Sequence, residues 1–344
     1  MRALTISAHG GTEQLELRTD LAIPEPGPGA VRVRIKAAAL NHLDVFTLGG
    51  LPDVTISPPW VMGADGTGIV DATGPGVETV ETGQTVIVNP GISDGTCEYC
   101  LGGEQSLCLR FGLLGEHHPG TFAEYVVVPA KNIRVIPAGI PVEEAAAFTL
   151  ATLTAWRMIV TRAKVGPDDD VLIWGIGGGV AQAALRIAKQ RGARVWVTSG
   201  SDDKLELARD LGADETINHR TTQVGREVRS RTGKKGVSVV IDSVGSDTWD
   251  QSLIALGRAG RLVTCGGTSG AMVKTDVRRL FWNQWTIMGS TMGNDAEFDA
   301  VTAELAAGRL LPRIDSVFDL SEGRAAFDRM AEGRQFGKIV LRIP

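Results

Sequence analysis

Three of the four cysteines lie close together in the first third of the chain, at spacings that suit a metal site. Cys97, Cys100 and Cys108 follow Asp94 in a glycine-rich segment, and such a cluster in a reducing compartment favours a metal over disulfides. Zinc accepts thiolates and carboxylates in a tetrahedral shell, and four protein ligands leave no open position for catalysis. The segment therefore predicts one structural zinc site.

Alternatives remain open for these cysteines. Glu98 or Glu104 can replace Asp94 as the oxygen ligand, and the three thiols can also be free or belong to a site that has lost its metal. The fourth cysteine, Cys265, stands alone at the end of an apolar run. We expect it to be a small core residue.

A glycine-rich turn in the middle of the chain forms a second candidate site. The apolar run Val171–Trp174 leads into Gly175, Gly177 and Gly178, and a helix is expected over Val180–Gln190. Glycines in a strand-to-helix turn let backbone N–H groups approach a pyrophosphate, and the helix N-terminus favours its negative charge. The turn predicts dinucleotide binding, with an ordinary tight turn as the alternative.

The next expected strand, Val195–Val197, is followed by residues that bear on the choice of dinucleotide. An NAD site usually places an acid here to bind the ribose 2′-OH, whereas a 2′-phosphate needs hydroxyls and a cation. Ser199, Ser201 and Lys204 therefore favour NADP(H) over NAD(H). Asp202 keeps NAD(H) open, because it lies near enough to be that acid.

The surrounding elements indicate two domains. Up to about Lys131, short β-rich runs alternate with Gly/Pro turns, which is typical of a compact β domain. The segment Val142–Ala163 contains no Gly or Pro and predicts one long helix at the domain boundary. Beyond it, apolar strands alternate with helices, which predicts a doubly wound α/β domain with a parallel sheet.

The expected domains are residues 1–150, 151–292 and a return to the first domain over 293–344. The strands expected in the first part are Val31–Ile35, Ile69–Ala72, Thr85–Val88 and Tyr125–Val128. The later elements expected are helices Asp203–Leu211, Thr222–Thr232 and Trp249–Leu256, strands Val237–Ile241 and Arg261–Cys265, and then Asp295–Ala307, Val317–Leu320, Glu322–Glu332 and Lys338–Arg342.

Composition excludes several classes of protein. A chain of 344 residues, 43% hydrophobic and 22% charged, is typical of a globular protein with about two domains. A formal net charge of −5, without long like-charge blocks, offers no surface for nucleic acid or anionic membrane. A small-molecule substrate is expected. The first residues lack the apolar run of a secretory signal, which indicates a cytoplasmic protein.

With the cysteine segment upstream of the glycine turn, the sequence resembles the medium-chain dehydrogenase/reductase superfamily over nearly its whole length. The segment is similar to the structural-zinc loop of alcohol dehydrogenases, where Asp94 departs from the first of four cysteines. The resemblance implies a GroES-like β domain plus a Rossmann domain. It also implies cofactor contacts from Thr154, from Gly266 and Gly267, and from Lys338 in a closing Phe-Gly-Lys strand.

The catalytic-zinc segments of the zinc alcohol dehydrogenases read differently here. The residues at the three ligand positions are Asn41, Ala64 and Leu150. Leu43 also replaces the hydroxyl that would relay the alcohol proton. The patterns Asn41-x-x-Asp44 and Gly63-x-Asp65 resemble the zinc-independent quinone and enone reductases of the superfamily, which implies a site without catalytic zinc.

Loss of this zinc favours particular acceptors. Reduction of a simple ketone puts charge on one oxygen and needs strong preorganised donors, whereas a quinone, enone or alkenal spreads the charge over a conjugated system. We expect NAD(P)H to deliver hydride to such an acceptor in a cleft between the domains. Under the resemblance, Asn41 orients ribose or substrate, His42 lies near the pyrophosphate, and Asp44 and Asp65 anchor the site.

Other interpretations stay open. Asn41, Asp44 and Asp65 can be structural, and His42 can rebuild a metal site with Asp65, His117 and His118. The chain can also be an alcohol dehydrogenase with an unusual metal, or an NADPH-binding protein without turnover. The apolar segment Trp285–Met288 is expected to pair copies into a homodimer, or a tetramer.

Overall fold

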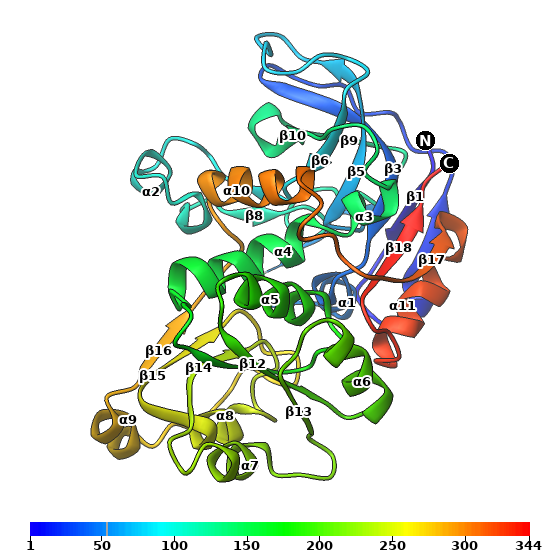
Figure 1. The fold of residues 1–344 in the computed structure, drawn as a ribbon. Helices are drawn as coiled ribbons and strands as arrows, with labels where there is room; N and C mark the ends of the chain where they lie inside the picture. Colours follow the sequence, from blue (N-terminus) through cyan, green and yellow to red (C-terminus); the bar gives the residue numbers. More distant parts are fainter. Residues whose placement is uncertain (53) are drawn as a thin grey trace. The chain divides into compact units, whose positions relative to one another are not determined.

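The structure is a computed structural model that describes residues 1–52 and 54–344. Contacts divide the chain into two compact units. Unit 1 comprises Met1–Ala151 and Gly293–Pro344, and unit 2 comprises Thr152–Met292 (Figure 1). Among the described helices, none has the length and apolar character needed to span a bilayer.

Unit 1 is organised around the long strand β3 (Ala30–Ala39) of a seven-stranded sheet. Alternate side chains of this strand, Val31, Val33 and Ile35, are fully buried, as expected of a strand with one face against a core. The other strands of the sheet are β5 (Asp65–Thr73), β6 (Thr85–Val88), β9 (Tyr125–Pro129), β10 (Ile133–Val135), β17 (Ile314–Asp319) and β18 (Lys338–Arg342). Because β18 pairs with β3, the end of the chain belongs to the first unit.

The remaining elements of unit 1 are short. Its small strands are β1 (Ala3–Ile6), β2 (Leu15–Arg18), β4 (Trp60–Val61), β7 (Gly91–Ile92) and β8 (Gly112–Leu113). Its helices are α1 (His42–Gly49), α2 (Glu98–Leu101), α3 (Val142–Ala146), α10 (Asp295–Ala306) and α11 (Gly323–Ala331), and α4 (Thr149–Trp156) leads from unit 1 into unit 2.

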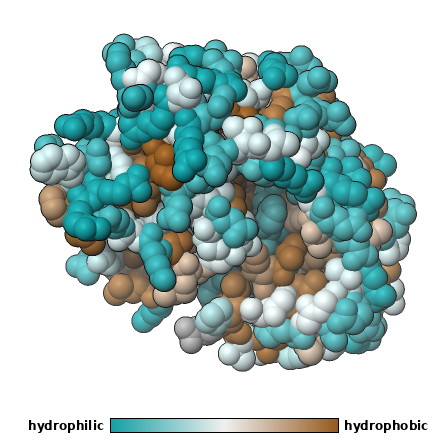
Figure 2. Space-filling model, turned by 90° about the horizontal axis from the view of Figure 1, so that it is seen from below, coloured by the Kyte–Doolittle hydropathy of each residue, from teal (hydrophilic) through white to brown (hydrophobic). Residues whose placement is uncertain are grey.

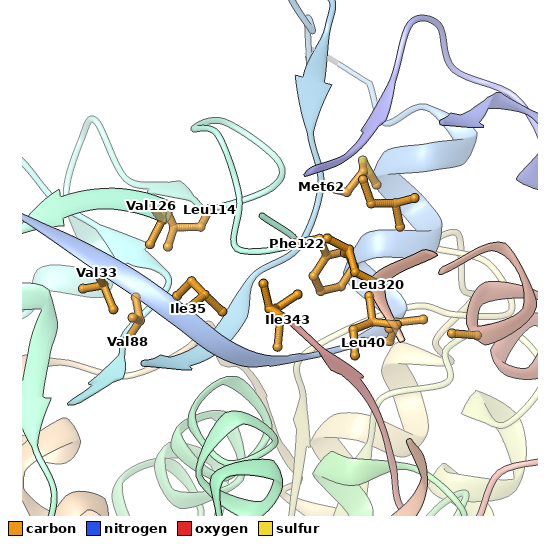
Figure 3. Close-up of a cluster of buried hydrophobic side chains, with 14 of the residues drawn as sticks. Val33, Ile35, Leu40, Met62, Val88, Leu114, Phe122, Val126, Leu320 and Ile343 are labelled. Carbon is orange, nitrogen blue, oxygen red and sulfur yellow. The ribbon is translucent and has the colours of Figure 1, made fainter. Parts of the chain in front are cut away.

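The core of unit 1 joins side chains from both parts of the sequence. Figure 3 shows Val33 and Ile35 of β3 in one cluster with Phe122 and with Ile343 from the end of the chain. Next to Phe122 the backbone requires glycine at position 63. Gly63 has φ of +100°, and a Cβ placed there would lie 2.2 Å from the Phe122 ring. Any side chain at this position would therefore be strained and would clash.

The prediction of a single long helix over Val142–Ala163 is wrong. A turn separates α3 from α4, and a π-helical stretch, Arg157–Arg162, follows α4. Near the break, the N–H of Leu150 donates to Asp65 Oδ1 at 2.7 Å, where a continuous helix would use the carbonyl four residues earlier. A carboxylate from a distant strand thus competes with the helical hydrogen bonds, and no local pattern reveals it.

Unit 2 is the doubly wound α/β domain predicted from the alternation of strands and helices. Its six strands are all parallel, in the order β13-β12-β11-β14-β15-β16. They are β11 (Asp170–Ile173), β12 (Arg194–Ser199), β13 (Glu215–Asn218), β14 (Val237–Asp242), β15 (Leu256–Thr264) and β16 (Thr286–Gly289). The helices are α5 (Gly179–Gln190), α6 (Asp202–Asp210), α7 (Val224–Arg231), α8 (Trp249–Ala255) and α9 (Val277–Asn283).

Hydrophobic side chains on the surface bear on the expected homodimer. Figure 2 shows one face of the molecule, where hydrophilic residues predominate and hydrophobic ones form separate areas. Among the described residues, Met272, Phe281 and Trp282 are strongly exposed, and the last two belong to α9, directly before the edge strand β16. An exposed sheet edge beside apolar side chains is compatible with association, and the homodimer stays a prediction.

Candidate functional site

The four expected metal ligands meet in one lobe of unit 1. One donor atom from each of Asp94, Cys97, Cys100 and Cys108 lies within 4.8 Å of the others. The antiparallel pair β7 and β8 flanks the lobe in the sequence, and α2 carries Cys100. Three sulfurs and one carboxylate oxygen are a donor set that Zn²⁺ accepts, and no position would remain open. The residues fit a structural zinc ion.

Backbone amides hold these ligands in place. The N–H groups of Asp94 and Arg110 each donate to Cys108 Sγ at 3.3 Å. The N–H groups of Cys97 and Thr96 donate to Asp94 Oδ1 and hold the pKa of the Asp94 carboxyl well below its usual range. The lobe therefore favours the ionised carboxylate, which is the form that binds a metal.

A lysine that the sequence interpretation missed lies next to this lobe. Lys131 Nζ donates to both the carbonyl oxygen and Oγ of Ser93, at 2.9 Å each. Its positive charge offsets part of the negative charge that four anionic ligands would leave around Zn²⁺. Lys131 follows β9 and is far from the cysteines in sequence. The alternative ligands Glu98 and Glu104 are not members of the ligand group.

Cys100→Ser is expected to abolish zinc binding, because Cys100 is buried and the lobe would lose one of its three thiolates. Elemental analysis should find about one zinc per chain in the wild type and little in the variant. Cys265→Ser, which changes a thiol of unit 2 outside the lobe, is the matched control and should retain the zinc. Zinc kept in the Cys100 variant would exclude the lobe as the binding site.

A second metal site built from histidines is not found in the described part of the chain. His42, His117 and His118 do not join Asp65 in any group that could hold a metal. His117 Nδ1 instead accepts the N–H of Leu113 at 3.3 Å. Desolvation of the imidazole lowers the pKa values of both His42 and His118, although His42 is exposed as a residue.

Asn41, one of the three positions at which zinc alcohol dehydrogenases hold a catalytic zinc, belongs here to a polar cluster with Asp65 and Lys338. These residues lie at the ends of three neighbouring strands, β3, β5 and β18. Lys338 Nζ donates to Asn41 Oδ1 at 2.6 Å and to Asp65 Oδ2 at 3.0 Å. Asn41 Nδ2 donates to the same Asp65 oxygen at 3.0 Å, and Leu150 N–H binds the other. One buried ammonium thus neutralises one buried carboxylate.

This polar cluster does not fit a catalytic zinc. None of the side chains at the three ligand positions, Asn41, Ala64 and Leu150, is a thiolate or an imidazole, and the group already contains a cation. The sequence predicts a cofactor contact for Lys338. The structure gives its ammonium two protein partners within unit 1, and the cofactor contact stays a prediction.

Two further expected site residues lie in the first turn of α1. Asp44 Oδ2 accepts the N–H of Asn41 at 2.7 Å and so caps the helix. Asp44 is 1% exposed, and burial raises its pKa to about 7, although the Asn41 amide and Lys338 oppose the rise. His42 begins the same helix, and burial followed by the charge of Lys338 lowers its pKa. The expected position of His42 near the pyrophosphate of the cofactor stays a prediction.

Asp44→Asn is expected to remove a pH dependence of stability. The folded state of the wild type holds a proton on Asp44 up to about pH 7, whereas the unfolded chain releases it near pH 4. The wild type should therefore lose stability as the pH rises from about 4 to 7, by on the order of 4 kcal/mol. In thermal unfolding across this range, the Tm of the variant should rise relative to the Tm of the wild type as the pH rises. A constant difference in Tm would contradict this.

The expected cofactor residues of unit 2 lie at the carboxyl ends of its parallel strands. Gly175, Gly177 and Gly178 connect β11 to α5, and Gly266 and Gly267 follow β15. Gly175 has φ of +69°, and its N–H donates to Thr198 Oγ1 at 3.1 Å. Ligands of open parallel sheets bind at this edge, with phosphate at the helix N-terminus. The arrangement suits a dinucleotide.

The residues that bear on the 2′-phosphate surround the end of β12. Ser199 is the last residue of this strand, and its Oγ accepts the N–H of Ser201 at 3.1 Å. Lys204 lies in the first turn of α6. Asp202, the alternative NAD-binding acid, accepts a hydrogen bond from Asn218 Nδ2 at 2.7 Å. Its carboxylate is therefore already engaged by β13.

Arg220 is a candidate that the sequence interpretation missed. A Cβ placed on Gly200 would lie 2.7 Å from Arg220 Nε and 3.1 Å from His219 Nε2, so these two side chains cross directly over the residue that follows β12. The His219 ring lies 6.2 Å from that of Trp174. Arg220 thus adds a guanidinium, the side chain best suited to a phosphate, to the hydroxyls there.

Thr154 and Cys265 are two further residues of unit 2 for which the sequence predicts a role. Thr154 lies within α4, and its Oγ1 contacts Met292 Sδ at 3.6 Å. Its contact with the nicotinamide stays a prediction. Cys265 directly follows β15 and is partly exposed as a residue, while burial of its thiol raises the pKa to about 12. A thiol with this pKa is protonated and unreactive at neutral pH.

Two family descriptions match the chain. Residues 27–138 match the family described as alcohol dehydrogenase GroES-like domain, and residues 179–307 match zinc-binding dehydrogenase. Together the two matches span more than half of the sequence. The first lies in unit 1 and the second covers much of unit 2.

Individual proteins and solved structures are similar to the chain over most or all of their length. The chain is 31% identical to an NAD-dependent alcohol dehydrogenase of Sulfolobus acidocaldarius over 351 residues, which covers 100% of each. It is 30% identical to a crotonyl-CoA reductase of Streptomyces avermitilis, covering 90% of this chain and 78% of the relative. A crystal structure of an NAD-dependent alcohol dehydrogenase is similar with a TM-score of 0.96 and 45% identity over 100% of both chains.

Proposed function

The chain belongs to the medium-chain dehydrogenase/reductase superfamily, in its zinc-containing alcohol dehydrogenase-like group, and from this premise we propose that it reduces conjugated carbonyl compounds with NAD(P)H. Membership makes it an oxidoreductase with a GroES-like domain and a Rossmann domain. The proposal adds the acceptor, which is a quinone, an enone or an alkenal. It also adds that hydride transfer proceeds without a catalytic zinc.

The polar cluster of Asn41, Asp65 and Lys338 is the observation that carries the proposal. Zinc would stabilise a full negative charge on the oxygen of a ketone, and the cluster has no ligand set for it. Its donors are an amide and a buried ammonium. Such donors suit an acceptor whose charge is delocalised after hydride addition, because less stabilisation is then needed at any one atom.

The names of the relatives support different acceptors. The crotonyl group, after which the Streptomyces avermitilis reductase is named, is an unsaturated acyl group with its double bond conjugated to the carbonyl. The alcohol dehydrogenase names favour the second candidate function, oxidation of an alcohol. Alcohol-dependent reduction of NAD(P)⁺ together with a second metal ion per chain would support that alternative.

An acceptor panel tests the proposal. Purified protein should oxidise NAD(P)H with 2-cyclohexenone or a benzoquinone as acceptor. It should do so far more slowly with cyclohexanone, which has the same ring and carbonyl but no conjugated double bond. Equal rates with both ketones, or activity with primary alcohols and NAD(P)⁺ only, would exclude the proposed acceptor class.

We also propose that NADP(H) is preferred over NAD(H), although two of the named relatives are NAD-dependent. The support is the cationic group at the end of β12. Arg220 Nε would lie 2.7 Å from a Cβ on Gly200, the residue that follows Ser199, while Asp202 is engaged by Asn218. A guanidinium with hydroxyls suits a phosphate better than a ribose hydroxyl.

Arg220→Gln is expected to raise the KM for NADPH about tenfold to a hundredfold, since one charge-assisted hydrogen bond contributes about 1.5–3 kcal/mol. The KM for NADH should change little, because NADH lacks the 2′-phosphate. Arg226→Gln, which alters an exposed arginine of α7, provides the control. If the KM values for NADPH and NADH rose by the same factor, Arg220 would have no role in the choice between the two cofactors.

A further inference from the structure

We propose that the Lys338 ammonium acts through Asn41 to stabilise the negative charge that develops on the acceptor oxygen. The inference rests on the proposed function and deepens it, because it names the source of positive charge in a site without catalytic zinc. Lys338 is a positioning residue here. Asn41 is the group that touches the acceptor.

The hydrogen bonds of Asn41 indicate how the charge of Lys338 affects the acceptor. Lys338 Nζ lies 2.6 Å from Asn41 Oδ1, a charge-assisted hydrogen bond to the amide oxygen. A cation on that oxygen draws electron density from the amide nitrogen, so the N–H groups become stronger donors. The polarisation passes along a chain of two bonded groups and needs no contact between Lys338 and the acceptor.

One N–H of the same amide remains for an acceptor. Asn41 Nδ2 donates to Asp65 Oδ2 at 3.0 Å, which uses one of its two hydrogens. Within the described part of the chain, the other reaches only the carbonyl of Ala39, at 3.4 Å, which is long for a hydrogen bond. A substrate oxygen at ordinary distance would compete well for this second N–H.

Burial separates the roles of the three residues. Asn41 is 7% exposed, whereas Lys338 is 3% and Asp65 0% exposed. Asn41 is therefore buried as well, but as a residue it is slightly more exposed than the other two. The charges of the other two lie in surroundings of low dielectric, where electrostatic effects are stronger than in water. Asp65 is fixed in turn by the Leu150 amide, so the donor is held in place before the substrate binds.

A purely structural role for Lys338, neutralising Asp65, must be separated from this one. Lys338→Met alone leaves the Asp65 carboxylate buried without its cation and is expected to destabilise the fold. The double variant Lys338→Met/Asp65→Asn removes both charges and keeps the side-chain shapes. The introduced amide oxygen can accept the Leu150 N–H, but its NH2 group then replaces the oxygen that accepts from Asn41 Nδ2. The double variant is therefore expected to recover part of the lost Tm.

Steady-state kinetics with NADPH and 2-cyclohexenone then distinguish the two roles. We expect the double variant to keep a kcat about tenfold to a hundredfold below the wild type, with little change in KM. The isotope effect with NADPH deuterated at the transferred hydrogen should rise, because hydride transfer becomes slower. A kcat that recovers together with Tm would overturn the proposal and leave Lys338 a structural role.

A second measurement does not depend on turnover. The probe is 4-nitrophenol, whose phenolate oxygen imitates the developing charge and whose absorbance reports its ionisation. The wild type with NADP⁺ should lower the pKa of the bound probe, and the double variant should lower it less. Equal shifts, or no shift in the wild type, would overturn the proposal. A shifted probe in a protein that reduces no enone would instead exclude the proposed function alone.

Discussion

Asp65→Ala is expected to lower the free energy of unfolding by about 3–5 kcal/mol, because it leaves the ammonium of Lys338 buried without a counter-ion. Asp65 is fully buried and accepts hydrogen bonds from Lys338, Asn41 and Leu150. Its loss would remove a buried acceptor from each of these three donors, and Lys338 would keep only the neutral Asn41 oxygen. Urea unfolding followed by circular dichroism measures the change.

Asp71→Ala is the matched control for this substitution. Asp71 lies on the same strand, β5, and pairs with Arg32 at 2.7 Å, but both side chains are partly exposed. Such a pair contributes about 1 kcal/mol or less. Similar losses in the two variants would show that the ion pair of Lys338 is no more important to the fold than a surface pair.

Asn41→Ala is expected to reduce kcat for enone reduction about a hundredfold, the effect of removing one preorganised donor to a developing negative charge. The backbone N–H of Asn41 that donates to Asp44 is retained, so α1 keeps that cap. The measurement is steady-state reduction of 2-cyclohexenone at a temperature well below the Tm of the variant.

Asn132→Ala controls for the stability that any buried amide contributes. Asn132 is also buried in unit 1, where its Nδ2 donates to the carbonyls of Asn89 and Gly91. This variant should lose Tm and retain kcat. An Asn41 variant that lost Tm and kept kcat in the same way would be a structural variant, and the proposed role of Asn41 would be wrong.

The fold was largely predictable because its signals are local. The apolar runs of β11, β12 and β14 are nearly fully buried, which makes them stand out in the sequence. Two of the elements that were missed lack this signal. The strand β13 is mostly half-buried, and α9 contains no buried residue, so neither has an apolar face that a periodic pattern could reveal.

The candidate sites differ in the same respect. The zinc lobe was predictable because its four ligands follow one another within a short segment. The polar cluster joins Lys338 to Asn41 and Asp65 across almost the whole chain. That contact depends on β18 pairing with β3, which no local pattern specifies. Arg220 was missed for a related reason, since it follows the unrecognised strand β13.

The destination of the hydride tests the proposed function most directly. The protein should be supplied with NAD(P)H deuterated at the transferred hydrogen and with 2-cyclohexenone, and the product examined by nuclear magnetic resonance. Addition to the conjugated system predicts cyclohexanone with deuterium on the carbon β to the carbonyl. Deuterium on the carbonyl carbon of an unsaturated alcohol would contradict it and would favour the chemistry of an alcohol dehydrogenase.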